Sequence, residues 1–318
     1  MKAVILLPLE EDAIKKIEEI AEGKCDIIYR TVDTVSAEDV CDADAVLGNL
    51  PPKLLKDTKN LKWLQSSMAG TDAYLGGVLP EGVILTNVTG AFGLAISEHM
   101  VANVFTLYKK LHLYRDNQNK SLWLDRGQVK QIEGAVVLTV GLGDIGGNFA
   151  KKMKALGAYT IGVRRKDTSK PEYIDELILQ EDLDNVLPKA DIVALALPNT
   201  SETKGLFNRE RIYSMKDGAT LINVGRGNAV DTEALCDALE DGKLYAAALD
   251  VTDPEPLPAE HRMWKIENAL ITPHISGFFH LRKTYENIVS IFIENFNRFL
   301  NNEPLENIID MTTGYKKK

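Results

Sequence analysis

Cysteine, long apolar runs and excess positive charge are all scarce in this sequence. Three cysteines in 318 residues are too few for a disulfide scaffold, and Cys25, Cys41 and Cys236 do not have the spacing of zinc ligands. No run approaches the ~20 apolar residues that a membrane-spanning helix needs. Acidic residues outnumber basic residues 46 to 37, a net charge of −9, which argues against nucleic acid or an anionic membrane as the main partner.

The N-terminal segment also lacks the features of a secretion signal. Its apolar run, residues 3–7, is too short for a signal peptide, and acidic residues follow it at positions 10–12. We therefore expect a cytoplasmic protein with no nucleic acid, membrane or metal ion among its partners.

The sequence is rich in short apolar runs that alternate with amphipathic stretches, the pattern of α/β folds with parallel sheets. Strands are predicted at residues 3–7, 26–29, 45–48, 61–65 and 83–87, and in a second series at 136–140, 160–163, 192–197, 220–224, 246–250 and 269–272. Helices are predicted at residues 11–21, 95–113, 148–156 and 285–300. The two series predict two doubly wound parallel-sheet domains, Rossmann-like or flavodoxin-like, with a cleft between them.

A glycine motif follows the apolar strand at residues 136–140. It reads Gly141-Leu142-Gly143-Asp144-Ile145-Gly146, which is G-x-G-x-x-G spacing between a strand and a helix. The first glycine makes the turn, the second lets the backbone approach a pyrophosphate, and the third allows close helix packing. The motif predicts a dinucleotide site with the pyrophosphate at the N-terminus of the helix.

The end of the next strand indicates which dinucleotide binds. An NAD site commonly has an acid ~20 residues beyond the glycines, where it binds the ribose 2′-hydroxyl. Here that strand ends in Arg164, Arg165 and Lys166. Because arginine forms charge-assisted bonds with phosphate, these cations favour NADP(H) over NAD(H). The alternative is a solvated basic loop in which Asp167 binds the ribose.

Three later segments each follow a predicted parallel strand, at the sheet edge where α/β proteins bind ligands. The strand at 220–224 is followed by Arg226, the strand at 246–250 ends in Asp250 and is followed by Glu255, and the strand at 269–272 is followed by His274. Each residue alone has a structural explanation. Together they supply a cation, an acid and an imidazole beside the predicted nucleotide site.

The sequence closely resembles the D-isomer-specific 2-hydroxyacid dehydrogenase family over nearly its whole length. The resemblance includes residues 61–72, Ser97-Glu98-His99, the glycine motif, the three segments above and residues 294–315. It implies that Arg226, Glu255 and His274 form the catalytic set. It also implies a substrate-binding domain of residues 1–98 plus 286–318 and a dinucleotide-binding domain of residues 99–285.

The implied reaction is reduction of a 2-oxo acid to a D-2-hydroxy acid by hydride transfer from a nicotinamide cofactor. Arg226 would anchor the substrate, and His274, paired with Glu255, would protonate the carbonyl oxygen as a general acid. Asp250 would orient the nicotinamide carboxamide. The main-chain N–H groups of Met68, Ala69 and Gly70 would bind the substrate carboxylate. The other implied cofactor-binding residues are Leu197, Pro198, Thr203, Val224, Gly225, Ser276 and Gly277.

More than one substrate and more than one oligomeric state fit the sequence. A glyoxylate/hydroxypyruvate reductase or a branched 2-oxo acid reductase is favoured over a 3-phosphoglycerate dehydrogenase. The formate dehydrogenase branch of the family resembles this chain but has Gln at the position of Glu255, which argues against a formate dehydrogenase. A non-catalytic, nucleotide-sensing corepressor, similar to the C-terminal-binding proteins, would share the fold. Family members are often homodimers, and the apolar seam at residues 95–108 is explained equally by a subunit interface or by burial within the chain.

Overall fold

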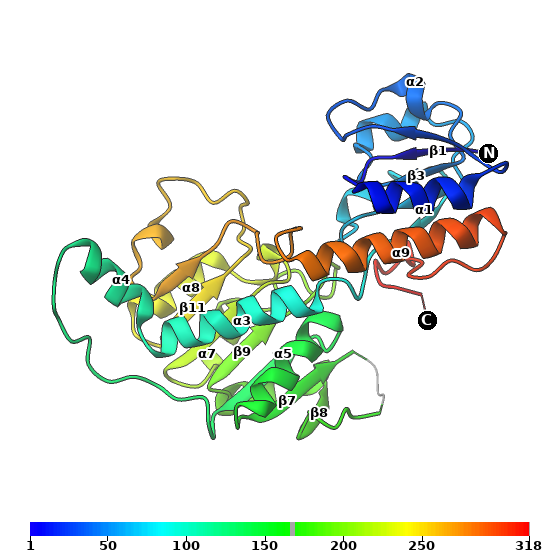
Figure 1. The fold of residues 1–318 in the computed structure, drawn as a ribbon. Coiled ribbons are helices and arrows are strands. Elements are labelled where there is room, and N and C mark those ends of the chain that lie inside the picture. The colour runs from blue at the N-terminus through cyan, green and yellow to red at the C-terminus, as the bar shows by residue number, and fades with distance from the viewer. Residues whose placement is uncertain (166–168, 318) are drawn as a thin grey trace. The chain divides into compact units, whose positions relative to one another are not determined.

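The computed structural model describes residues 1–165 and 169–317, which form two compact units. The first unit is Met1–Ala91 with Phe279–Lys318, and the second is Phe92–Phe278. Each unit contains one sheet in which all neighbouring strands are parallel (Figure 1). The predicted class, two doubly wound α/β domains, is confirmed.

The sheet of the first unit has five strands in the order β2-β1-β3-β4-β5, which is the flavodoxin-like order. The strands are β1 (Lys2–Ile5), β2 (Asp26–Tyr29), β3 (Ala45–Leu47), β4 (Trp63–Gln65) and β5 (Ile84–Thr86). The helices are α1 (Glu11–Ala21), α2 (Ala37–Val40) and α9 (Arg282–Leu300), and α1 and α9 lie side by side (Figure 1). The C-terminal helix therefore completes the unit that the N-terminal third begins.

The sheet of the second unit has seven strands in the order β12-β11-β10-β9-β6-β7-β8. Read from β8, this is the Rossmann order 3-2-1-4-5-6 with one more strand at the far edge. The strands are β6 (Val136–Val140), β7 (Tyr159–Arg164), β8 (Glu176–Leu179), β9 (Ile192–Leu195), β10 (Ala219–Asn223), β11 (Leu244–Leu249) and β12 (Ala269–Ile271). The helices are α3 (Gly93–Tyr108), α4 (Leu111–Asn119), α5 (Asp144–Ala155), α6 (Leu183–Val186), α7 (Arg209–Ser214) and α8 (Thr232–Glu240).

The prediction of one continuous helix at residues 95–113 is wrong. The structure has two helices, α3 and α4, because Lys110 takes a left-handed backbone conformation with φ of 55° between them. Ile96, Met100 and Val104 on the predicted seam are buried within their own unit, where α3 packs against α5. Intramolecular burial therefore explains these three seam residues.

The boundary predicted after residue 98 lies inside α3, whereas all of α3 belongs to the second unit. A helix packs as one element, so the division falls before its first residue, Gly93. Residues 279–285, assigned from the sequence to the dinucleotide domain, belong to the first unit. Within the described residues, no helix has the length and apolar character that crossing a membrane requires.

Candidate active site

The topology of the second sheet brings the predicted catalytic segments to one edge. Strands β10, β11 and β12 are parallel neighbours, so their carboxyl ends lie side by side. Arg226 follows β10, Glu255 follows β11 and His274 follows β12. This is the edge at which open α/β sheets bind ligands.

His274 and Glu255 form a direct pair at this edge. The Nδ1 atom of His274 lies 2.6 Å from Oε1 of Glu255, and the side chains are 38% and 42% exposed. The main-chain N–H of His274 donates to the carbonyl oxygen of Asp250 at 2.8 Å. Because Glu255 occupies Nδ1, the ring orientation is fixed and Nε2 is the nitrogen left for proton transfer.

Two glycines fix the backbone on either side of Arg226. A Cβ on Gly225 would lie 2.5 Å from the carbonyl oxygen of Leu197, and a Cβ on Gly227 would overlap the carbonyl oxygen of Thr252. Neighbouring strand-end loops thus approach too closely for any side chain at these positions. The sequence Gly-Arg-Gly is therefore a packing requirement that places one cation between two loops of the site.

Asn223 is a site residue to which the sequence interpretation gave no role. It is buried at the end of β10, its side-chain amide donates to the carbonyl oxygen of Arg226 at 2.9 Å, and its Oδ1 accepts from the N–H of Gly225 at 3.0 Å. Both bonds hold the turn that carries Arg226. A buried amide directly before Val-Gly-Arg-Gly was the available signal, since buried polar groups need partners.

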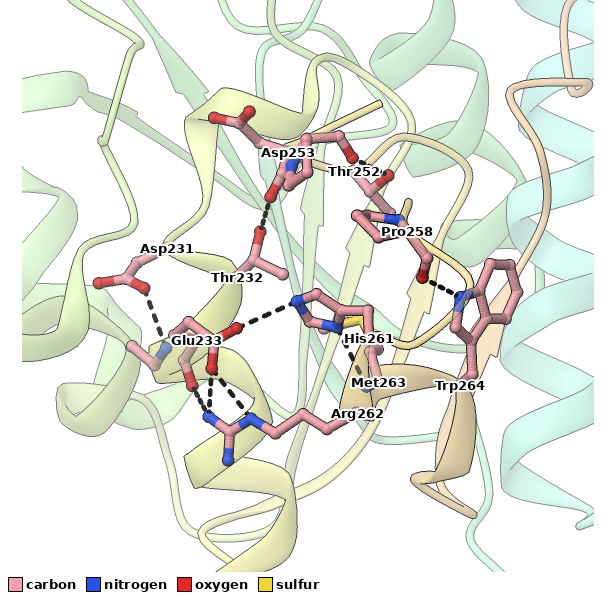
Figure 2. Close-up of polar contacts among 12 residues, drawn as sticks. Asp231, Thr232, Glu233, Thr252, Asp253, Pro258, His261, Arg262, Met263 and Trp264 are labelled. Carbon is pink, nitrogen blue, oxygen red and sulfur yellow. Dashed lines mark hydrogen bonds and ion pairs between the residues drawn. The ribbon is translucent and has the colours of Figure 1, made fainter. Parts of the chain in front are cut away.

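The loop that carries Glu255 is tied to helix α8 (Figure 2). The Thr232 hydroxyl donates to the carbonyl oxygen of Asp253 at 2.8 Å, and Nε2 of His261 lies 3.0 Å from Oε1 of Glu233. Arg262 binds the same Glu233 carboxylate at 2.7 Å. These contacts hold the loop to α8 on both sides of Glu255. His261, which had no motif support, has this structural role.

The glycine motif has the geometry that its spacing predicts. Gly141 has φ of 97°, and a Cβ there would lie 2.6 Å from the carbonyl oxygen of Ala196. A Cβ on Gly146 would overlap the carbonyl oxygen of Gly141. At Gly143, by contrast, a Cβ would meet no described atom within 4 Å. The first and third glycines are thus required by packing, and the second faces open space where a pyrophosphate could approach.

The remaining motif residues secure the turn. Leu142 is buried and packs against Gly162 of β7, where a Cβ would overlap its side chain. The Asp144 carboxylate accepts from the N–H of Gly93 at 2.7 Å, which joins the first turn of α5 to the first turn of α3. Ile145 is half-buried in the same turn of α5.

Arg164 and Arg165 lie at the tip of β7, next to the end of β6 from which the glycine turn leaves. Arg164 donates to the carbonyl oxygen of Ser169 at 3.4 Å, and Arg165 lies 3.6 Å from the carboxylate of Glu202. Lys166 and Asp167, the other residues of the cofactor prediction, lie outside the described residues.

Two side chains expected at the cofactor have their polar groups engaged within the protein. The buried Thr203 hydroxyl donates to the carbonyl oxygen of Pro198 at 2.7 Å, and this bond stabilises the loop after β9. The Ser276 hydroxyl donates to Asp250 at 2.5 Å. The other predicted cofactor-binding residues of these loops are Leu197, Val224, Gly225 and Gly277, all at or beyond the ends of β9, β10 and β12.

Met68, Ala69 and Gly70 lie in the first unit, after β4. The N–H of Met68 donates to the Ser66 hydroxyl at 3.1 Å, and Asn87 donates to the carbonyl oxygen of Ala69 at 2.7 Å. Among the hydrogen bonds formed by the described residues, none uses the N–H groups of Ala69 and Gly70. These two groups, rather than that of Met68, are the donors that this loop offers to an anion.

The family model for the NAD-binding domain of the D-isomer-specific 2-hydroxyacid dehydrogenases matches residues 101–276, which is more than half of the chain. The chain belongs to this family. The family resemblance and the enzyme class, NAD(P)-dependent oxidoreductase, are therefore confirmed. A solved family member from Aeromonas salmonicida is 31% identical, with 98% of this chain and 99% of that chain covered and a TM-score of 0.86.

Two further relatives have more specific descriptions. An NADPH-dependent glyoxylate/hydroxypyruvate reductase from Sinorhizobium meliloti, solved with NADP and sulfate, is 25% identical with a TM-score of 0.82, and 99% of each chain is covered. A D-3-phosphoglycerate dehydrogenase from Methanocaldococcus jannaschii is 28% identical over 98% of this chain. The alignment spans 60% of the length of that longer relative.

Proposed function

We propose that this protein reduces a 2-oxo acid to a D-2-hydroxy acid. The observation that carries the proposal is the 2.6 Å contact between His274 Nδ1 and Glu255 Oε1, in the same unit as the glycine turn. The open space at Gly143 and the close packing at Gly141 and Gly146 fit a dinucleotide. When bound, the nicotinamide cofactor supplies the hydride.

In the proposed mechanism each residue has one task. Arg226 binds the substrate through the planar guanidinium fork, which suits a carboxylate and the adjacent carbonyl oxygen. In the first unit, the main-chain N–H groups of Ala69 and Gly70 are the proposed donors to an anionic group of the substrate. His274 donates the proton on Nε2 to the carbonyl oxygen as the hydride arrives. Glu255 holds the ring so that this nitrogen faces the substrate.

We propose NADP(H) as the preferred cofactor, with Arg164 as the main ligand of the 2′-phosphate and Arg165 beside it. Two cations at the tip of β7, with no acid in residues 159–165, support this preference because an acid there would repel the phosphate. The Sinorhizobium meliloti reductase, which was solved with NADP, also supports it. If Asp167 binds the ribose instead, NAD(H) is preferred.

We assign substrate binding to the first unit and dinucleotide binding to the second, and we also propose a homodimer. After α4, Leu122, Trp123 and Leu124 are each more than half exposed. Contiguous exposed apolar side chains are uncommon on monomers, and a second copy of the chain would cover them. A cytoplasmic location remains a prediction.

Two other functions are alternatives. A 3-phosphoglycerate dehydrogenase is supported by the Methanocaldococcus jannaschii relative. A nucleotide-sensing corepressor would keep the dinucleotide turn and could keep the His274–Glu255 pair as well, so turnover on a 2-oxo acid is what distinguishes it from an enzyme.

The test is oxidation of NADPH and of NADH in the presence of glyoxylate, hydroxypyruvate, pyruvate, 2-oxoisocaproate and 3-phosphohydroxypyruvate. Fast turnover with a 2-oxo acid, and NADPH preferred, is the expected result. Preference for 3-phosphohydroxypyruvate would select the phosphoglycerate alternative. Tight nucleotide binding without turnover on any acid would contradict the reductase and favour the sensor.

A further inference from the structure

Asp250 is a buried carboxylate, 1% exposed, at the end of β11. Its Oδ1 accepts from the Thr272 hydroxyl at 2.6 Å and from the N–H of Ile275 at 2.9 Å. Its Oδ2 accepts from the N–H of Ser276 at 3.1 Å and from the Ser276 hydroxyl at 2.5 Å. Burial raises the pKa of Asp250, but these hydrogen bonds outweigh burial and leave that pKa below its usual value.

The four donors come from one turn, residues 272–276, which also contains His274. A carboxylate offers about four lone-pair sites, and the turn fills them. The protein contacts of Asp250 thus lie within this turn, and a bond from the nicotinamide carboxamide to Asp250, which the family resemblance implies, stays a prediction. His274 has φ of 53° within the turn, a left-handed conformation that is uncommon for residues other than glycine. The bonds on either side of His274 hold it there.

His99 on α3 extends this network, since its Nε2 lies 3.3 Å from the Thr272 hydroxyl oxygen. Thr272 has a single hydroxyl proton, and that proton points to the ionised Asp250, which only accepts. The Thr272 oxygen must therefore accept from His99, and Nε2 of His99 must carry a proton. Burial lowers the pKa of His99, while the charge of Asp250 partly opposes this, so the ring is neutral at pH 7 in the Nε2–H tautomer.

We propose that His99 is a positioning residue of the reductase: its Nε2–H, through Thr272 and Asp250, holds the turn that presents His274 to Glu255 and to the substrate. This role rests on the proposed function, because it concerns the turnover of a 2-oxo acid. The bonds run in one direction, from His99 to Thr272 to Asp250. His99 therefore acts as a donor, and another donor in its place should substitute for it.

The kinetic test compares His99→Gln with His99→Leu. A glutamine amide reaches about as far as Nε2 and can donate to Thr272, whereas leucine fills the space without a donor. We expect His99→Gln to keep kcat within about threefold and His99→Leu to lose up to ~10²-fold, because small misplacements of catalytic groups cost that much. KM for NADPH should stay within about threefold in both. Equal activity of the two variants would contradict the donor role.

A spectroscopic test does not depend on turnover. Nitrogen-15 NMR of the wild-type histidine side chains, with His99 assigned by comparison with His99→Gln, should show the neutral Nε2–H tautomer at pH 7. The Nδ1–H tautomer would overturn the inference even if the protein is an active reductase. The Nε2–H tautomer in a protein that reduces no 2-oxo acid would instead overturn the proposed function and leave the hydrogen-bond direction standing. His112→Gln, a change at a histidine bonded to Thr106 on α3, is the matched control.

Discussion

Gly227 and Thr252 approach so closely that a Cβ on Gly227 would overlap the carbonyl group of Thr252. The contact joins the loop after β10, which carries Arg226, to the loop after β11, which carries Glu255. Neither residue has a role in the proposed reaction. The relative placement of a cation and an acid in the second unit thus depends on the absence of a single carbon atom.

Gly227→Ala should therefore damage both stability and activity. The clash is with main-chain atoms, which give little, so we expect a loss of about 1–3 kcal/mol in the free energy of unfolding. Displacement of Arg226 should lower kcat/KM by ~10²-fold. Urea denaturation and steady-state kinetics measure the two effects. A variant as stable and active as the wild type would show that the loops are not held by this contact.

The opposite effect on stability is predicted for Gly143→Ala. A Cβ at Gly143 meets no described atom within 4 Å, so the unfolding free energy should change little. The added methyl would occupy the space through which the pyrophosphate approaches and would remove one or two charge-assisted bonds. We expect the Kd for NADPH to rise ~10–100-fold. Fluorescence titration of both proteins tests this, and unchanged affinity would mean that the phosphates bind elsewhere.

Arg164→Ala should change cofactor preference rather than overall binding. Loss of a charge-assisted contact to the 2′-phosphate should raise the Kd for NADPH ~10–100-fold and leave the Kd for NADH nearly unchanged. Lys154→Ala, which removes one positive charge from the far end of α5, is the control for general electrostatics. Titrations at constant ionic strength are required, because salt screens exposed charges. Parallel losses for both cofactors would refute the 2′-phosphate role of Arg164.

The lowered pKa of His99 predicts a pH dependence of stability. In the unfolded chain His99 takes up a proton at its usual pKa of about 6.5, whereas in the folded protein its pKa is lower. Below about pH 6.5 the unfolded state therefore binds more protons, and the folded protein loses stability as the pH falls. His99→Gln removes this titration. The difference in unfolding free energy between wild type and His99→Gln should therefore shift in favour of the variant from pH 7 to pH 5.5. Urea curves at both pH values measure it, and a difference independent of pH would contradict the lowered pKa.

The sequence was most informative where local pattern decides structure. The runs 26–29 and 136–140 are strands with the predicted limits, and the helix at 11–21 is correct at both ends. The glycine motif was recognisable because strand, turn and helix are contiguous in the chain. The break between α3 and α4 could not be recognised, because a lysine gives no sign that Lys110 takes a left-handed conformation. Strand β8 was also missed, because its four residues form an edge strand that only pairing with β7 reveals.

The proposed reactive groups of the candidate site could be picked out from the sequence, whereas the residues that hold them in place could not. Arg226, Glu255 and His274 stand out by charge and by position after strands. His99 and Thr272 are 173 positions apart, and they come into contact only because α3 packs beside β11 within the second unit. Asn223 acts on its own turn, but its two bonds depend on the turn geometry. Positioning roles of this kind follow from tertiary contacts that a single sequence does not display.

The most direct test of the account is the single-turnover rate of 2-oxo acid reduction by NADPH-loaded wild-type protein and by His274→Gln. If His274 is the general acid, the variant should bind NADPH with unchanged Kd and reduce the best substrate ~10²–10⁴-fold more slowly. A wild-type rate in His274→Gln would remove the general acid from the site and contradict the mechanism.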